Sequence, residues 1–435
     1  LLAAVAARGF GYLATGQLLA RLDAALTTME RMSRYRGHFY NWYDTTTLEP
    51  LRPRYVSTVD SGNLAAQLIT LQSALLAVAD EPLLPDAWRE GVHDTFGVLL
   101  ESLAADPRKE DPPLRDALVQ FSRTLMARRA RPPVALRDWH AMLDALEAGA
   151  VSICGALRLP APPDEAVAAP ADTGGQDVAA AVEAWARLLM AQCRAGRDEL
   201  RALGLDAPRG ALASTGMPTL RQLAAGGDTL DPADEATREA ARRRLQKIEA
   251  LAGRAAALTE AEHGFLYDDA RHLMTIGYNV DERRADTGYY DLLASEARLG
   301  VFVAIARGQL GQESWFALGR LLTSAAGAPV LLSWSGSMFE YLMPMLLMPS
   351  YEHTLLDQTC RGAVQRQIEY GRQRGVPWGI SESGYNATDA ALNYQYRAFG
   401  VPGLGLKRGL ADDLVVTPHA SMMALMLAPE PACEN

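Results

Sequence analysis

The chain has 435 residues, of which 49% are hydrophobic and 22% are charged, and its formal net charge is −10. This composition is typical of a globular protein with one large domain or two to three smaller ones. The acidic balance argues against a nucleic-acid-binding protein, whose surface is usually basic, but it is compatible with a neutral sugar substrate.

The four cysteines lie far apart and form no CxxC pair: Cys154, Cys193, Cys360 and Cys433. We therefore expect buried thiols of a reducing compartment rather than a disulfide framework. No uninterrupted apolar run reaches the roughly 18 residues of a membrane-spanning helix. The opening segment lacks the basic region and cleavage site of a secretory signal. Because the chain starts without Met and stops without a tail, we expect a piece of a longer protein.

The first aromatic-rich block contains HFYNWYDTTTLEPLRPRYVSTVDSGNL. Trp42, Tyr43 and Asp44 precede a proline-bounded turn, and VSTVDSGNL then enters a predicted helix with polar residues suited to capping it. Asp44, Arg54 and Asp60 could hydrogen-bond sugar hydroxyls. Turn and cap chemistry alone is the alternative interpretation of these polar residues.

The middle of the chain, 61–264, is poor in aromatic residues and rich in Ala, Leu, Arg and Glu. Apolar residues three and four apart, as in ADEATREAARRRLQKIEALAGRAAAL, predict amphipathic helices. The stretch LPAPPDEAVAAPADTGGQD at 159–177 is a break rich in Pro, Ala and Gly, and we expect an exposed loop between long helices.

Aromatic residues become frequent again over 265–400, where strand signals are few. The segments GFLYDD, HLMTIGYN and APVLLSW could form short strands or extended loops near a pocket rim. Regular strand–helix alternation, which a doubly wound α/β fold requires, is missing. The pattern favours an all-α toroid with aromatic inner loops, built from both ends of the chain, with the middle supplying outer helices or an inserted subdomain.

Several common sites are absent from the sequence: there is no P-loop, no GxGxxG after a strand and no HExxH. The stretch GISESG is not a nucleophile elbow, because Ser383 replaces the second glycine of GxSxG. His263 and His272 lie nine residues apart and share no helix face, so ordinary polar histidines are favoured over a metal site.

Carboxylates beside aromatic side chains remain, and this combination is typical of sugar-processing sites. Aromatic rings stack on the apolar faces of pyranoses, while two carboxyl groups perform acid/base and nucleophilic steps at the glycosidic bond. Glu340, in SWSGSMFEYLMP, follows Ser337 by three residues. That spacing before an apolar run is a capping box, so a structural role is favoured for Glu340.

Glu296 lies in DTGYYDLLASEARLGVFVAIARGQL, which predicts a helix beginning near Asp286. Leu292, Leu299 and Val303 would share its helix face, so its carboxyl would point along the apolar stripe. A carboxyl in that position must be paired or have a raised pKa, and a raised pKa suits a general acid. A buried ion pair with an arginine of another helix is the alternative.

Glu382 lies in PWGISESGYNATDAALNYQY, which we interpret as a loop entering a helix. Gly379 and Gly384 would let the backbone approach a ligand closely, and Trp378 and Tyr385 would supply faces for stacking. A sugar site explains this concentration of groups. A structural loop packed by aromatic residues is the alternative.

Four long stretches resemble the central glycoamylase-like domain of cyclic β-1,2-glucan synthases. They are GHFYNWYDTTTLEPLRPRYVSTVDSGNLAAQLITL, YNVDERRADTGYYDLLASEARLGVFVAIARGQL, SWSGSMFEYLMP and GVPWGISESGYNATDAALNYQYRAFGVPGLGLKRGL. The resemblance spans 37–75 and 264–435, whereas the middle region is similar only in its helical character.

The resemblance implies an all-α fold containing an (α/α)6-barrel-like toroid, truncated here because the family has further helices beyond the point where this chain stops. Residues 1–75 would form the N-terminal part of the catalytic helical barrel. Residues 76–260 would be a helical insertion or outer helices, and 261–435 the C-terminal part carrying the catalytic glutamates. A few short strands would lie at the pocket rim.

The resemblance also implies a retaining transglycosylase that cyclises linear β-1,2-glucan through a glucosyl-enzyme, with Glu296 as acid/base and Glu382 as nucleophile. An endo-β-1,2-glucanase and a non-catalytic β-glucan-binding module are the alternatives. Further residues expected to contact substrate are Trp42, Tyr43, Asp44, Arg54, Asp60, Asp286, Tyr289, Trp334, Glu340, Tyr341, Trp378, Tyr385, Asn386 and Tyr394.

The family's parent protein is a large bacterial inner-membrane protein, in which this domain would lie on the cytoplasmic side. The implied partners are linear β-1,2-glucan and the glycosyltransferase and phosphorylase-like domains of that parent. The resemblance implies no cofactor, no metal ion, no nucleic acid and no membrane span within this chain.

Overall fold

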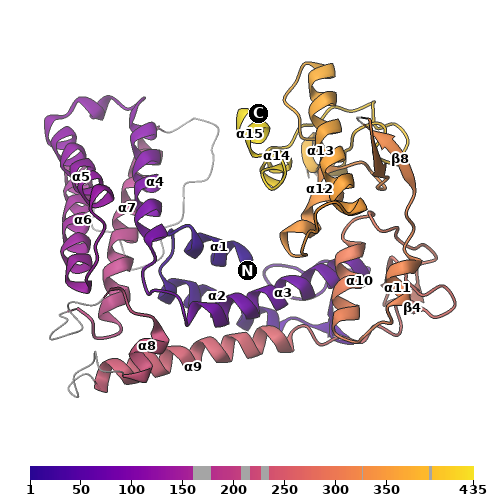
Figure 1. The fold of residues 1–435 in the computed structure, drawn as a ribbon, viewed down its shortest axis with the longest axis horizontal. Coiled ribbons are helices and arrows are strands. Elements are labelled where there is room, and N and C mark those ends of the chain that lie inside the picture. Colours follow the sequence, from indigo (N-terminus) through magenta and orange to yellow (C-terminus); the bar gives the residue numbers. More distant parts are fainter. Residues whose placement is uncertain (160–177, 207–215, 227–234, 326, 391–393) are drawn as a thin grey trace. The chain divides into compact units, whose positions relative to one another are not determined.

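The computed structural model describes residues 1–159, 178–206, 216–226, 235–325, 327–390 and 394–435 (Figure 1). These residues form two units: unit 1 comprises Leu1–Glu30 and Leu71–Ala256, and unit 2 comprises Arg31–Thr70 and Ala257–Asn435. The first 30 residues therefore group with the middle helices. The functional boundaries expected at 75 and 260 remain a prediction. The loop predicted at 159–177 lies, from residue 160 onward, outside the described residues.

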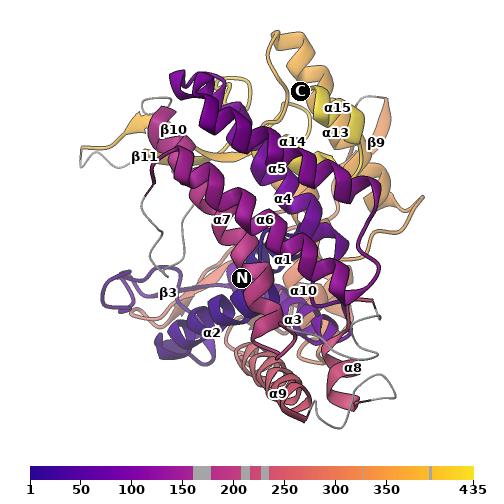
Figure 2. The same ribbon diagram turned by 90° about the vertical axis from the view of Figure 1, so that its left-hand side faces the viewer.

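Unit 1 is built from helices. They are α1 (Leu2–Gly9), α2 (Thr15–Arg31), α4 (Asp86–Leu103), α5 (Pro112–Ala130), α6 (Leu136–Ala156), α7 (Val178–Arg201), α8 (Leu220–Ala225) and α9 (Glu235–Ala257), with a 3-10 turn at Pro107–Glu110. Figures 1 and 2 show α4 to α7 as neighbouring helices, and α7 packs on both α4 and α6.

The predicted amphipathic character of the middle region is confirmed in these helices. In α6 the buried residues recur three or four apart, as Leu136, Trp139, Leu143 and Leu146 show. One face of the helix is thereby apolar and packs in the interior of unit 1.

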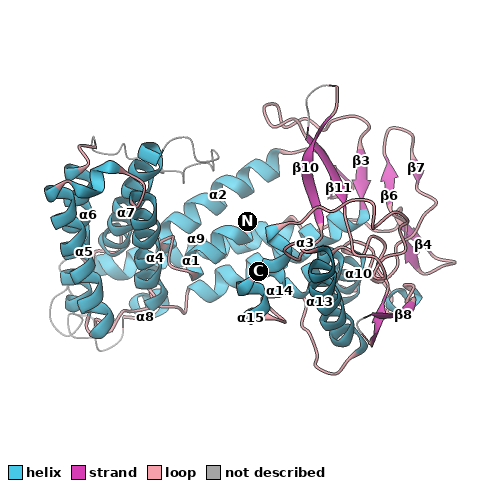
Figure 3. Cartoon of the chain, turned by 90° about the horizontal axis from the view of Figure 1, so that it is seen from above, coloured by secondary structure: helices cyan, strands magenta, loops and turns pink. Residues whose placement is uncertain are grey.

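Unit 2 combines helices with short strands (Figure 3). Its helices are the first part of α3 (Thr58–Val78), α10 (Ala297–Ala306), α11 (Glu313–Ala317), α12 (Met338–Leu342), α13 (Leu355–Arg374), α14 (Pro418–Ala424) and α15 (Pro429–Glu434), with a 3-10 turn at Met343–Leu346. Its strands are β1 (Arg34–Tyr35), β2 (His38–Phe39), β3 (Tyr55–Ser57), β4 (Tyr267–Asp268), β5 (Leu273–Met274), β6 (Gly277–Asn279), β7 (Arg284–Ala285), β8 (Leu322–Ala325), β9 (Ala328–Leu331), β10 (Glu382–Thr388) and β11 (Tyr394–Ala398).

The short strands predicted in GFLYDD, HLMTIGYN and APVLLSW are confirmed as β4, β5 with β6, and β9. Strand β6 lies between β3 and β7 in a three-stranded antiparallel sheet, which joins the first aromatic-rich block to the second. The other described sheets are two-stranded antiparallel pairs. Segments far apart in the sequence therefore meet within unit 2.

The prediction that PWGISESGYNATDAALNYQY is a loop entering a helix is wrong. The segment forms the antiparallel pair of β10 and β11, with Glu382 opposite Ala398 and Gly384 opposite Tyr396. The backbone groups of this exposed stretch are satisfied across the pair of strands, a non-local arrangement that the local Gly and Asn pattern does not specify.

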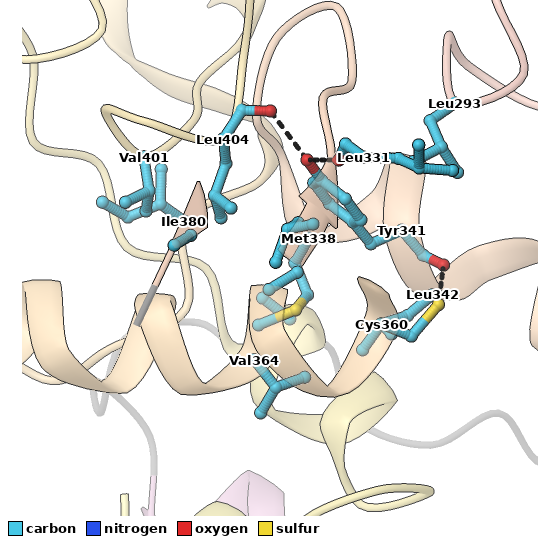
Figure 4. Packing of buried hydrophobic residues seen from close by; sticks show 14 of the residues in the cluster. Leu293, Leu331, Met338, Tyr341, Leu342, Cys360, Val364, Ile380, Val401 and Leu404 are labelled. Carbon is cyan, nitrogen blue, oxygen red and sulfur yellow. Dashed lines mark hydrogen bonds between the residues drawn. The ribbon is translucent and has the colours of Figure 1, made fainter. Parts of the chain in front are cut away.

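The interior of unit 2 is centred on α12 and α13 (Figure 4). Tyr341 is fully buried there, and its hydroxyl lies 2.9 Å from the carbonyl oxygen of Leu331 and 2.7 Å from that of Leu404. The thiol of Cys360 lies 3.3 Å from the carbonyl oxygen of Tyr341. These bonds anchor α12 to the strands and loops around it.

Helix α3 has the length and mean hydropathy of a membrane span, which the search for uninterrupted apolar runs did not indicate. Core helices of globular proteins meet the same criteria. In this structure Leu68 is fully buried, and the side chain of Asn63 contacts a buried carboxylate of unit 2. The burial of Leu68 and the hydrogen bond of Asn63 both fit a helix that packs within a folded domain.

The expected buried thiols are confirmed for three of the four cysteines, and each of the four is free. Cys433, near the end of the chain, is exposed, so the expectation of burial is wrong for that residue.

Candidate active site

Glu296 lies immediately before α10, so the prediction that its helix begins near Asp286 is wrong. Ser295 has a positive φ of 50°, which no residue inside a right-handed helix adopts, and the helix therefore begins only at Ala297. Glu296 is nevertheless buried, with 6% of its surface exposed, and its side chain makes no capping bond.

Neutral donors satisfy the carboxylate of Glu296. The side-chain amide of Asn63 on α3 donates to Oε1 over 3.1 Å, and the hydroxyl of Ser295 donates to Oε2. Within the described part of the chain, no arginine or lysine lies at ion-pair distance from this carboxylate. The alternative of a buried ion pair is therefore not supported.

Burial raises the pKa of Glu296, and the nearby charge of Asp60 raises it further. The hydrogen bonds from Ser295 and Asn63 favour the ionised form and oppose this shift. The result is a carboxyl that holds its proton to higher pH than an exposed glutamate does, as a general acid requires.

Two glycines bring α3 and α10 together at this point. A Cβ atom on Gly62 would lie 2.4 Å from the Cα atom of Gly300, so no larger residue fits between the two backbones. This close approach places Asn63, the next residue of α3, against Glu296. The first aromatic-rich block and the second thus contribute to one site.

Glu382 is the first residue of β10 and is half-buried. The hydroxyl of Tyr396, on β11, donates to its Oε2 over 2.7 Å. Burial raises the pKa of Glu382, the Tyr396 bond lowers it, and the charges of Glu340, Glu296 and Asp60 raise it. Glu296 and Glu382 are therefore electrostatically coupled, and the ionised form of one favours the protonated form of the other.

Tyr290, which was not predicted as a site residue from the sequence, lies among the acidic residues of this site. Burial and the charges of Asp60, Glu296, Asp286 and Glu382 together raise its pKa to about 12. It also lines a small, mostly apolar pocket with residues of α3 and α10. The sequence contains Tyr289 and Tyr290 in succession, and no local pattern distinguishes which ring faces the carboxylates.

The predicted site residues of the first aromatic-rich block are largely occupied by contacts within the protein. Asp44 accepts bonds from the amides of Thr46 and Thr47, and the hydroxyl of Tyr43 donates to the carbonyl of Ser33. Arg54 is held by Asp281 through two bonds of 2.9 and 2.7 Å. The bonds of Asp44 fit the turn-chemistry interpretation, whereas Arg54 is bound to a residue 227 positions away in the sequence. Trp42, with 69% exposure, and Asp60 remain open to a ligand.

Of the other residues predicted to contact substrate, two are exposed to solvent and two are hydrogen-bonded to other side chains. Trp334 has 59% of its surface exposed, and Asn386 is exposed on β10. Asp286 accepts a bond from Tyr55, and the hydroxyl of Tyr289 donates to Asp268 over 2.5 Å. The side chain of Tyr394 lies outside the described residues.

Two predicted sugar contacts, Trp378 and Tyr341, are buried in the interior of unit 2, and a third, Tyr385, packs against that interior. Trp378 packs beside Gly371, and Tyr341 belongs to the core described above. Tyr385 is half-buried against Phe399, with ring centroids 5.2 Å apart. The packing of Trp378 and Tyr385 fits the structural alternative stated for the segment around Glu382.

Glu340 is buried, with 2% exposure, and its carboxylate accepts hydrogen bonds from Ser333, Ser335 and Ser337 at 2.6–3.2 Å. The capping box predicted between Ser337 and Glu340 is confirmed. The carboxylate thus holds the loop that presents Trp334, and it is not accessible to a sugar itself.

In the described ranges, no group of three or more His, Cys, Asp or Glu side chains is arranged to hold a metal ion. The described residues bring together at this site the carboxyls of Glu296 and Glu382 and the phenols of Tyr290 and Tyr396.

Comparison with known proteins places both glutamates in a matched region. Residues 288–435 match the family described as "Glycoamylase: Putative glucoamylase". The whole chain is 37% identical, over 453 aligned residues, to the cyclic β-(1,2)-glucan synthase NdvB of Rhizobium meliloti (strain 1021). The predicted resemblance is confirmed. The chain spans only 14% of the length of that synthase, so the relative extends far beyond the matched segment.

Two solved structures are similar at low sequence identity. An endo-β-1,2-glucanase from Chitinophaga pinensis, in complex with sophorotriose and glucose, gives a TM-score of 0.34 at 12% identity, covering 83% of this chain and 80% of the other. A "putative glucoamylase" from Bacteroides fragilis NCTC 9343 gives 0.32 at 15% identity, covering 83% and 79%. Such scores do not establish a closed barrel. The (α/α)6 toroid stays a prediction, and the helix-rich character is confirmed.

Proposed function

We propose that this chain is a carbohydrate-active domain that processes β-1,2-glucan, and that it is a retaining transglycosylase which closes linear chains into rings. The pair Glu296 and Glu382 carries the proposal. Both lie within the region matched to the glycoamylase family and both have a raised pKa, and the charge of Glu296 adds to the cost of ionising Glu382. The identity to a cyclic β-(1,2)-glucan synthase supports the choice of glucan.

In the proposed reaction, ionised Glu382 attacks the anomeric carbon of an internal linkage. The bond from that carbon to the departing 2-oxygen breaks, and Glu296 gives its proton to this oxygen directly or through a sugar hydroxyl. The 2-hydroxyl at the non-reducing end of the same chain then attacks the glucosyl-enzyme. Its proton passes to Glu296 and Glu382 is released.

The hydrogen-bond partners of the two carboxyls suit these different roles. Tyr396 favours the ionised form of Glu382 and occupies one of its oxygens, which leaves Oε1 for the anomeric carbon. Glu296 is more deeply buried than Glu382, which favours its protonated form. Exposed Trp42 and Trp334 offer faces on which glucose rings could stack.

A hydrolase is the second candidate. Tyr396 remains 67% exposed although it touches Glu382, so water has a path to the intermediate. An endo-β-1,2-glucanase using the same two carboxyls would release shorter linear chains instead of rings.

The deciding experiment is mass spectrometry of the products formed from linear β-1,2-glucan. Ring closure gives species lighter than the linear glucan by one water, and hydrolysis gives only shorter linear chains. Turnover is expected to disappear in Glu382→Gln and Glu296→Gln and to persist in Glu352→Gln, which changes an exposed glutamate of the same unit. Full activity in Glu382→Gln would contradict the assignment.

Azide distinguishes the two glutamates. With an activated β-linked glucosyl donor, Glu296→Ala should still form the intermediate, and azide should release a β-glucosyl azide. In Glu382→Ala azide takes the place of the nucleophile, so the product should be the α-glucosyl azide. The opposite pairing of variants and products would exchange the two roles.

We further propose that the domain acts beside the glycosyltransferase and phosphorylase-like domains of a parent synthase, at the cytoplasmic side of a bacterial inner membrane. Cross-linking within the full-length synthase, followed by peptide mapping, tests this arrangement.

A further inference from the structure

Helix α12 is hydrogen-bonded at its first turn to the segment that leads into Glu382. The amide of Met338 donates to the carbonyl of Ile380 over 3.0 Å, and the amide of Phe339 donates to the hydroxyl of Ser381 over 3.0 Å. The first amides of a helix have no partner within it, so they are available for such bonds. Ser381 is fully buried and directly precedes Glu382.

The last turn of the same helix is bonded to the segment that follows Glu296. The guanidinium of Arg298, on α10, donates to the carbonyl of Glu340 over 2.8 Å and to that of Tyr341 over 2.6 Å. The carbonyl of Glu340 has no helical partner four residues on, because Pro344 lacks an N–H group. The sequence therefore leaves this carbonyl free for Arg298.

Arg298 is unusual because it is a buried cation, with 3% exposure, bonded to carbonyl oxygens. No carboxylate of the described residues lies at ion-pair distance from its guanidinium. Burial lowers the pKa of Arg298, which reflects the cost of placing a charge in the interior. The planar guanidinium can hold two successive carbonyls in one orientation, which the single ammonium of lysine cannot do.

Surrounding contacts fix α12 between these two ends. Gln367 on α13 holds Ile380 through two bonds of 2.8 Å, one from each of its side-chain atoms. Met338, Tyr341 and Leu342 are fully buried in the core of unit 2 (Figure 4). The carboxylate of Glu340 binds the serine loop that carries Trp334. The helix thus has little freedom to shift.

We infer that α12 is a spacer that sets the separation of Glu296 and Glu382, with Arg298 and Ser381 as positioning residues at its two ends. The inference rests on the proposed function for its catalytic consequence. The distance between the two carboxyls decides the reaction. At a short separation Glu382 reaches the anomeric carbon itself, and at a longer one a water molecule fits between the carboxylate and that carbon. A loosened spacer should therefore slow ring closure and shift products toward hydrolysis.

The first test measures the ratio of rings to linear chains made by Arg298→Lys. This variant keeps the positive charge and loses the pair of hydrogen bonds to the carbonyls of Glu340 and Tyr341. We expect kcat to fall about 10- to 100-fold with KM nearly unchanged, and linear products to increase relative to rings. The matched control is Arg8→Lys, a buried arginine of unit 1 that contacts Thr15 and Glu81. It should lower stability without changing the ratio of rings to linear chains.

Ser381→Ala tests the opposite end of the spacer and removes only one hydroxyl. Ser381→Ala should also lower kcat. In the double variant Arg298→Lys/Ser381→Ala the fold-loss of kcat should be smaller than the product of the two single fold-losses, because both substitutions act on one helix. Multiplicative effects, or losses that follow only the folded fraction measured by circular dichroism, would overturn the inference.

A second test does not depend on activity. In a chain carrying Glu296→Cys, Glu382→Cys and Cys433→Ser, bifunctional methanethiosulfonates of increasing length report the span between the two positions. With Arg298 present, one narrow range of lengths should bridge the pair, and Arg298→Lys or Ser381→Ala should widen that range. An unchanged range would refute the spacer. If the wild-type chain forms no product from glucan, the proposed function fails while this test still decides the spacer.

Discussion

The hydroxyl of Tyr396 donates a hydrogen bond to Oε2 of Glu382 over 2.7 Å, across the two strands that carry them. The strand register explains this contact. Tyr396 pairs with Gly384 and Glu382 pairs with Ala398, so the two side chains lie on the same face as diagonal neighbours. Gly384 has no side chain to occupy the space between them. A feature interpreted from sequence as a loop therefore delivers a phenol to the candidate nucleophile.

Tyr396→Phe should raise the pKa of Glu382, because the lost hydrogen bond favours the ionised form. A nucleophile must be ionised, so the acid limb of the pH profile of kcat/KM should move to higher pH. The loss at neutral pH should be about tenfold, as expected for a bond to a charged group. Tyr351→Phe, at another exposed tyrosine of unit 2, is the control. If the acid limb does not move, Tyr396 does not influence the pKa of the nucleophile.

Asn63→Leu should affect the carboxyl of Glu296 and the basic limb of the pH profile of kcat. The amide of Asn63 lowers the pKa of Glu296, so its removal should raise that pKa further. A general acid must be protonated, and the basic limb of kcat should therefore move to higher pH. Thr70→Val on the same helix removes a bond to the carbonyl of Ala66 and should leave this limb in place. Movement of the acid limb instead would indicate that Asn63 acts on Glu382.

Glu340→Gln should lower the free energy of unfolding by about 1–3 kcal/mol, the cost of an unsatisfied buried polar group. One acceptor oxygen becomes an amide that faces the hydroxyls of Ser333 and Ser335. Urea unfolding measures the loss, and the fluorescence of exposed Trp334 should change with it. Glu352→Gln should leave both unchanged. A Glu340→Gln chain of unchanged stability would show that these hydrogen bonds do not stabilise the fold.

Acid should destabilise unit 2 through His38. Burial lowers the pKa of this histidine to about 4, while Nε2 donates to the carbonyl of Glu262 over 2.8 Å, and the ring meets His263 edge-on. Between pH 6.5 and 4 the unfolded chain binds a proton that the folded chain does not, so stability falls as the pH falls. The loss should approach about 3 kcal/mol below pH 4, and about 2 kcal/mol of it should appear between pH 7 and pH 5. Urea unfolding at pH 7 and pH 5 measures it, and His38→Gln should show a smaller difference.

Local patterns in the sequence predicted the features that depend on neighbouring residues. The spacing of apolar residues predicted helices such as α6, and the separation of Ser337 and Glu340 predicted a capping box, because helix faces and caps involve residues three or four apart. The long motifs around Glu296 and Glu382 carried the resemblance to the glucan synthase, and the structure couples the two carboxyls electrostatically.

The errors occurred where backbone conformation, burial or pairing between strands decides the structure. The helix expected from Asp286 begins at Ala297, because Ser295 has a positive φ. Trp378 and Tyr341 were expected at a surface but pack in the core, since an aromatic residue in a motif carries no mark of whether its ring is covered. The β10–β11 pair depends on bonds between strands, which local propensity specifies poorly.

Residue types and their short spacings thus establish the helical character of this protein and its two candidate glutamates. Their surroundings depend on contacts between distant parts of the chain, such as that of Asn63 with Glu296, which are 233 positions apart. Burial, charge and the α12 spacer between the two segments arise only when those contacts form. A pKa and a separation between two carboxyls are properties of packing in three dimensions, and no window of sequence contains them.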